Sequence, residues 1–164
     1  MTPLPDLEID LDERFQRREW HVQRAAWVLW AAVIAAGLSG VLGSGPLSST
    51  TSAADDQSLT VAYDRFLHYH HPTRLELVLA QGVGDEPRVT LSRELLDAVR
   101  ISSIEPPPVR TELADAGVAY IFRGDVTAGA KIVYFLEYET LGPCGGTIQL
   151  AGRSPAVIRQ FVYP

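Results

Sequence analysis

The residue types best suited to chemistry gather in one short segment, His68-Tyr69-His70-His71, which holds three of the four histidines. On an extended chain, side chains two residues apart point to the same side, so His68 and His70 can share a Zn²⁺ or Cu²⁺ ion. No cysteine or carboxylate stands at an obvious ligand spacing, and Asp64 reaches the pair only if the chain folds back. The segment is therefore a metal site at His68 and His70, an acid sensor or a solvated loop, and the sequence favours the loop.

The single cysteine, Cys144, lies in the turn-rich sequence Leu-Gly-Pro-Cys-Gly-Gly, which superficially resembles a nucleophile loop. A reactive thiol needs a nearby base or cation, and no histidine lies within seventy residues of it in sequence. Hydrolase, metalloprotease and nucleotide-binding motifs are absent from the chain. We therefore expect Cys144 to be a small turn residue, and we expect neither enzymatic activity nor a cofactor.

The charge distribution argues against a nucleic-acid partner. The net charge of −6 divides into −2 on residues 1–24, with four arginines against six acids, and −4 on residues 55–164, with ten basic residues against fourteen acids. Neither part carries the clustered basic face that nucleic-acid binding requires. A lone cysteine also excludes an internal disulfide, so an apolar core must hold the folded part together.

One segment predicts the location of the protein. Residues 25–54 carry no charged side chain, and residues 25–43 are almost entirely apolar or small. As a helix, these nineteen residues reach about 28 Å, close to the roughly 30 Å hydrocarbon thickness of a bilayer. The sequence therefore predicts a single transmembrane helix over residues 25–43.

The flanking residues predict which way this helix faces. Cations precede the span and none follows it until Arg65; the preceding ones are Arg14, Arg17, Arg18 and Arg24. We therefore expect a bacterial inner membrane, with residues 1–24 as a cytoplasmic tail and the C-terminal domain periplasmic or extracellular. Trp20, Trp27 and Trp30 are expected at the membrane interface. The rival interpretation is a signal peptide cleaved before Asp55.

A stripe of small residues, Ala32, Ala36 and Gly40, recurs at every fourth position of the span. Such spacing lets two helices approach closely and makes the stripe a candidate face for homo-oligomers. A segment rich in alanine and glycine also produces this spacing by chance, and the sequence favours chance.

Residues 44–57 are rich in Gly, Ser, Thr and Pro and predict a flexible linker. Residues 58–164 alternate short β-like runs with turn residues, which predicts a mainly β domain, an immunoglobulin-like sandwich with one short helix after Ser92. The predicted strands cover residues 58–63, 74–80, 88–91, 118–123, 130–139, 147–150 and 156–162. Three consecutive prolines, Pro106 to Pro108, indicate a sheet edge or a strand switch rather than a proline-rich ligand.

Three segments carry a resemblance, namely residues 18–24, residues 45–48 and residues 160–164. They resemble a family of uncharacterised bacterial proteins with a single N-terminal span and a C-terminal periplasmic β-domain. The resemblance implies the same architecture and an association with other membrane proteins. We therefore expect a membrane-anchored accessory protein that binds another membrane or envelope protein, with a metal or pH sensor at His68–His71 as the alternative.

Overall fold

The computed structural model describes residues 13–38, 48–80, 86–124 and 129–164, with side chains from residue 16 onward. The chain divides into two compact units, residues 1–38 and residues 39–164, and each is described here by itself. The N-terminal unit contains helix α1 (Glu13–Leu38), which includes residues 25–38 of the predicted transmembrane helix. Its segment Gln16–Leu38 is long and apolar enough to cross a membrane, and none of it is buried inside the protein. The predicted span end, residues 39–43, lies outside the described residues.

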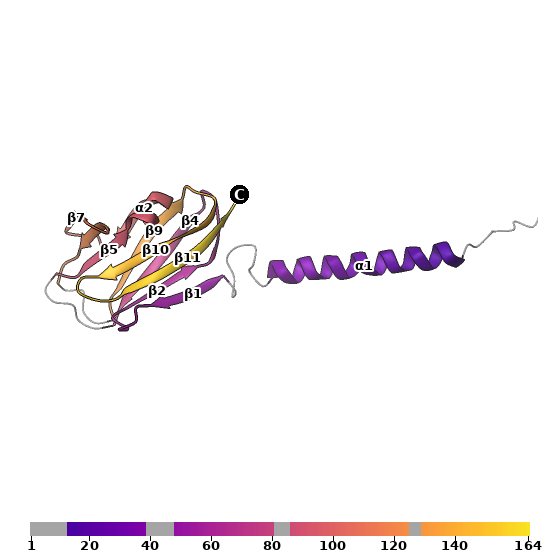
Figure 1. Ribbon diagram of the computed structural model, residues 1–164, viewed down its shortest axis with the longest axis horizontal. Helices are drawn as coiled ribbons and strands as arrows, with labels where there is room; N and C mark the ends of the chain where they lie inside the picture. The colour runs from indigo at the N-terminus through magenta and orange to yellow at the C-terminus, as the bar shows by residue number, and fades with distance from the viewer. Residues whose placement is uncertain (1–12, 39–47, 81–85, 125–128) are drawn as a thin grey trace, which may run out of the picture. The chain divides into compact units, whose positions relative to one another are not determined.

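The second unit, here called the β-domain, contains two sheets (Figure 1). Sheet A has five strands, each antiparallel to its neighbours, in the order β1-β2-β4-β9-β6. Their bounds are β1 (Ser49–Ala53), β2 (Leu59–Asp64), β4 (Pro72–Leu79), β9 (Lys131–Tyr138) and β6 (Val99–Glu105).

Sheet B has six strands in the order β3-β11-β10-β5-β8-β7. Strands β3 and β11 pair in parallel, and the other pairs of this sheet are antiparallel. The strand bounds are β3 (Phe66–His68), β11 (Pro155–Tyr163), β10 (Gly142–Leu150), β5 (Arg88–Ser92), β8 (Gly117–Ile121) and β7 (Arg110–Ala114).

The two sheets enclose one apolar core to which both contribute. Strand β9 shows how the sequence builds it: Ile132, Tyr134, Leu136 and Tyr138 are buried, and the residues between them are half-buried or exposed. This alternation confirms the prediction for residues 130–139, since successive side chains of a strand point to opposite faces. From sheet B, Leu91, Ile148 and Ile158 join the same core.

Two connections join the sheets on opposite ends of strand β6. Helix α2 (Arg93–Ala98), the short helix that the sequence predicts, carries the chain from β5 in sheet B to β6 in sheet A. The prolines after Glu105 then separate β6, an edge strand of sheet A, from β7, an edge strand of sheet B. The predicted strand switch is therefore confirmed.

Several boundaries differ from the predictions. Residues 49–53 of the predicted flexible linker form strand β1, because their backbone pairs with β2 along its whole length. Strands β3, β6 and β7 were also not predicted, since they are short or carry charged and serine residues without clear alternation. The structure shows a mainly β domain of two sheets, and its immunoglobulin-like topology stays a prediction.

Candidate interaction surfaces

The histidine segment is not extended, so the geometric premise for pairing His68 with His70 is wrong. Strand β3 ends at His68 and the chain turns at Tyr69 and His70, where His70 has a φ of 56°. The ring of His68 lies 6.2 Å from that of Tyr163, whereas the ring of His70 packs edge-on against Tyr69 at 4.1 Å. Each of the two imidazoles therefore packs against a different tyrosine.

A hollow of about 550 Å³ instead has His68 and His71 in its wall, together with Asp64 and Ser49. In the described ranges, no three histidine, cysteine, aspartate or glutamate side chains lie close enough to hold a metal ion. His70 does not line this hollow, and His71 Nδ1 lies 2.9 Å from the carbonyl oxygen of Pro72. A metal site at His68 and His70 therefore stays a prediction for which the described residues supply no third ligand.

Cys144 lies in strand β10, not in the turn that the sequence predicts. The two glycines after it serve close packing: a Cβ atom on Gly145 would meet the carbonyl oxygen of Ile158 at 2.6 Å, and one on Gly146 would meet Leu95 Cβ at 2.7 Å. The half-buried thiol lies 3.2 Å from Thr140 Oγ1. The thiol contacts a hydroxyl and backbone carbonyls, and Glu94 and Asp97 line the same hollow.

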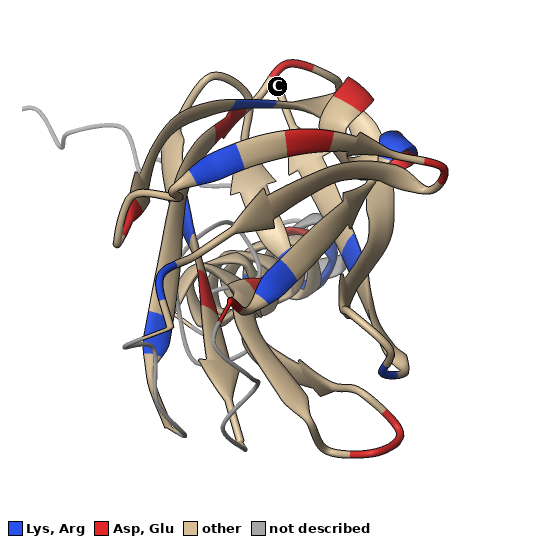
Figure 2. Cartoon of the chain, turned by 90° about the vertical axis from the view of Figure 1, so that its left-hand side faces the viewer, with Lys and Arg blue, Asp and Glu red and all other residues tan. Residues whose placement is uncertain are grey.

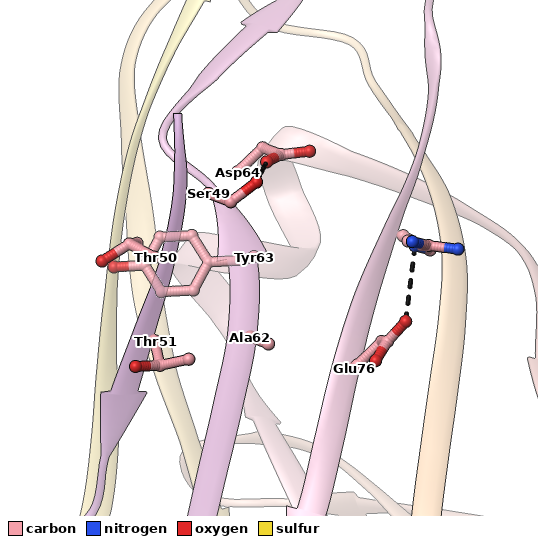
Figure 3. Close-up of a pocket in the computed structure, with 8 residues that line it drawn as sticks. Ser49, Thr50, Thr51, Ala62, Tyr63, Asp64 and Glu76 are labelled. Carbon is pink, nitrogen blue, oxygen red and sulfur yellow. Dashed lines mark hydrogen bonds and ion pairs between the residues drawn. The ribbon is translucent and has the colours of Figure 1, made fainter. Parts of the chain in front are cut away.

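Strand β1 forms one edge of sheet A and borders a shallow hollow of about 500 Å³ on the outer face of that sheet. Figure 3 shows the wall of this hollow, with Ser49 and Thr51 of β1 next to Asp64 of β2 and Glu76 of β4. The Ser49 hydroxyl donates a hydrogen bond of 2.7 Å to Asp64, and Arg74 lies 3.4 Å from Glu76. Polar groups thus stand directly beside the free edge of β1.

The four sheet edges of the β-domain differ in how they are protected from pairing with another chain. Strand β6 has an irregular register between Ile101 and Ser103 and is followed by prolines. Strand β7 carries one arginine and one glutamate, and β3 has three residues. Short length, charge, proline and bulges are the usual protections of edge strands. Strand β1, with the sequence Ser-Thr-Thr-Ser-Ala and a regular register of five residues, contains no charge, proline or bulge of its own, although Arg65 donates a 2.9 Å hydrogen bond to Thr50.

The ion pairs that protect β7 form a small network on the outer face of sheet B. Arg88 lies 2.9 Å from Glu112, and Arg110 lies 3.0 Å from Glu112 and 3.1 Å from Glu86. Figure 2 shows basic and acidic residues interleaved along the strands. Charges of both signs therefore alternate on this part of the surface.

The end of sheet B opposite β7 is different, because aromatic side chains gather along β3 and β11. The ring of Tyr163 lies 6.0 Å from that of Phe66 and 5.1 Å from that of Phe161. Phe161 and Val157 remain 40% and 47% exposed. This cluster, which sequence analysis missed, has one signal in the sequence: the alternation of exposed and buried residues along β11 places every second residue outside.

In helix α1, the helical period places Trp20, Trp27 and Trp30 on one side and Ala32 and Ala36 on the opposite side. The tryptophans are 52% to 69% exposed, and the guanidinium of Arg24 lies 4.8 Å from the Trp20 ring centroid. Gly40, the third member of the small-residue stripe, lies outside the described residues. Interface contact by the tryptophans and helix packing by the alanines stay predictions.

No family model, no curated protein and no solved structure matches the chain. The resemblance to single-span bacterial membrane proteins therefore stays a prediction, and the surfaces described above are the basis for a proposed function.

Proposed function

We propose that this chain is a non-enzymatic, membrane-anchored interaction protein. In this proposal α1 crosses a bacterial inner membrane with its N-terminus in the cytoplasm, and an immunoglobulin-like β-domain outside binds another membrane or envelope protein. Support comes from the apolar, unburied segment of α1 and from the arginines that precede it.

The observation that carries the proposal is the unprotected edge of β1. An edge strand presents a row of unpaired N–H and C=O groups, and an extended segment of a partner can add to the sheet there. Strand β1 is regular over its five residues and uncharged, while β6 and β7 carry charges and adjoin prolines. Because β3 has only three residues, three of the four edges are protected and β1 is the preferred place for an added strand.

The hollow beside β1 indicates what the added strand would carry. Every second side chain of an added strand would lie on the outer face of sheet A, next to Ser49 and Thr51. Asp64, Arg74 and Glu76 stand in the same hollow. We therefore propose a partner segment with alternating polar side chains, able to hydrogen-bond with these groups.

Site-specific photo-cross-linking tests this proposal in the native membrane. A photoreactive amino acid replaces Thr51 on β1 in the full-length protein, and the matched control carries it at Leu113 on β7, another exposed edge position. We expect an adduct with a second protein from position 51 and none from position 113. A further Ala53→Lys change, which adds a charge to the edge, should abolish that adduct.

Three outcomes contradict the proposal. Equal adducts at both positions, or none at either, would mean that β1 is not a preferred edge. An adduct at position 51 with twice the 18.0 kDa mass of the chain would indicate self-association through β1 in place of a foreign partner.

A further inference from the structure

The aromatic cluster belongs to a larger surface on the outer face of sheet B, here called the β3/β11 face: Phe66, His68, Val157, Arg159, Phe161 and Tyr163. Phe66 pairs with Phe161 and His68 pairs with Tyr163 in the parallel register of β3 and β11. Paired residues of neighbouring strands project to the same side of a sheet. The face is therefore a continuous aromatic strip, and Arg159 lies on the same side of β11 as Phe161 and Tyr163.

The strands that form this face carry charge of one sign, and the acidic Asp64 of β2 borders it in the hollow that Phe66 and His68 also line. Strands β3, β10 and β11 contain no aspartate or glutamate, and Arg159 is exposed. Arg65, directly before β3, is also exposed and donates a 2.9 Å hydrogen bond to Thr50. Asp56, in the turn between β1 and β2, lies near the start of β11 in space, where its carboxylate accepts a hydrogen bond from the Ser154 N–H. The β3/β11 face is thus basic and aromatic, in contrast to the alternating charges around β7.

The chain also enters the β-domain beside this face. Ser48 accepts a 2.8 Å hydrogen bond from the Arg65 N–H, and its hydroxyl lies 3.2 Å from both the N–H and the carbonyl oxygen of Phe66. Nine residues separate Ser48 from Leu38, the last described residue of α1, and a chain of that length reaches at most about 34 Å. An anchored helix therefore keeps Ser48 within reach of the membrane surface.

We propose that the β3/β11 face docks on the surface of the bilayer that α1 crosses, with a preference for anionic phospholipids. Tyrosine favours the headgroup region, exposed phenylalanine rings bury apolar surface at the boundary with the acyl chains, and arginine is attracted to anionic headgroups. Phe66, Phe161 and Tyr163 supply the rings, and Arg159 supplies the charge. This inference rests on the proposed anchoring by α1.

Depth-dependent quenching separates the docking from the anchoring. All three tryptophans lie in α1, so quenching of their fluorescence by lipids brominated on the acyl chain reports insertion of the helix alone. In a Cys144→Ala background, a fluorophore attached at Val157→Cys reports the β3/β11 face, and one at Thr51→Cys reports the outer face of sheet A. The full-length protein is placed in nanodiscs of phosphatidylcholine, with and without phosphatidylglycerol.

With phosphatidylglycerol, we expect stronger quenching at position 157 than at position 51. Arg159→Gln should weaken this docking by about fivefold, the effect of one basic residue near an anionic surface. Ser103→Glu on sheet A changes the net charge of the protein by the same amount as Arg159→Gln and should leave the docking unchanged. Circular dichroism of each variant verifies that the β-domain remains folded.

Two results overturn the inference. If the tryptophans are quenched but the labels at positions 157 and 51 are quenched equally, the anchoring stands and the docking is refuted. Unquenched tryptophans would refute the anchoring itself and the docking with it.

Discussion

The two lateral sides of the β-domain are held together by different interactions. On the β1/β3 side, formed by β1 and β3, hydrogen bonds to the backbone join the sheets: the buried Gln160 of β11 donates a 2.7 Å bond to the carbonyl oxygen of Asp64 in β2. On the β6/β7 side, formed by β6, Pro106–Pro108 and β7, exposed ion pairs predominate, such as the 2.7 Å contact of Arg100 with Glu139. Both sides end in edge strands, and charge protects one of them.

This difference bears on function, because charge at an edge discourages association with another strand. The hydrogen bonds of the β1/β3 side stabilise the fold and leave β1 without a charged residue of its own, although some of them involve Asp64 or Arg65. The ion pairs of the β6/β7 side protect β7 and contribute little stability. Four predictions test this comparison, in order of decreasing change in stability.

Gln160→Leu should lower the free energy of unfolding by about 2 kcal/mol, since it leaves buried polar groups without a partner. The Tyr138 hydroxyl donates to Gln160 Oε1, and the amide of Gln160 donates to Asp64. Chemical denaturation of the full-length protein in nanodiscs measures the change. Gln149→Leu removes an exposed amide that bonds to Arg153 and is the control, with an expected loss below about 0.5 kcal/mol. Equal losses in both variants would contradict the prediction.

Two buried tyrosines of β9 should respond differently to loss of the hydroxyl. Tyr138 donates to Gln160, whereas the Tyr134 hydroxyl has no hydrogen-bond partner among the described residues. Burial raises the pKa of Tyr138 above its ordinary value of 10.0, so its hydroxyl remains a neutral donor. Tyr138→Phe should cost about 1 kcal/mol, and Tyr134→Phe should be neutral or stabilising. A larger loss for Tyr134→Phe in the same denaturation measurement would refute this ranking.

Glu112→Gln breaks two ion pairs of the β6/β7 side and should cost less than about 1 kcal/mol, because all three side chains are at least one-third exposed. The loss should shrink in concentrated salt, which screens exposed charges. Ser48→Ala, which removes the neutral hydrogen bonds to Phe66, should show a loss that does not change with salt. The same salt response in both variants would remove the proposed distinction between the two sides.

The smallest effect concerns acid. The Ser58 hydroxyl, which donates a 2.6 Å hydrogen bond, is the main cause that lowers the pKa of Asp56 below its ordinary value of 3.8. A lowered pKa in the folded state contributes stability that is present above 3.8 and is lost as the pH falls through the folded-state value.

Asp56→Asn should therefore reduce the loss of stability on acidification below pH 3.8, measured from denaturation midpoints. Asp55→Asn removes the same charge one residue away and is the control. An unchanged acid response in Asp56→Asn would show that the hydrogen bonds of Asp56 in the β1–β2 turn contribute nothing to it.

The sequence predicted the elements whose signals are local. All seven predicted β runs overlap strands of the structure, and α2 follows Ser92. In β9 the alternation is clear enough to identify the buried face, while β1 has only serine, threonine and alanine and no apolar period. Strand β1 forms because its backbone pairs with β2, which follows after five intervening residues.

The candidate surfaces could be predicted less well than the fold. The sequence singled out His68 and His70 because their spacing suits a strand, but a turn with positive φ at His70 separates them. The β3/β11 face was not predicted because its members lie far apart in the chain. Phe66 and Phe161 become neighbours only through the parallel pairing of β3 with β11.

The division of this protein into an apolar helix and a mainly β domain follows from composition and periodicity, because both are properties of adjacent residues. Long-range pairing sets which edge is uncharged, which strands share the aromatic face and which buried amide joins the sheets. Gln160 and Asp64 are 96 residues apart, and no local pattern encodes a hydrogen bond across that separation.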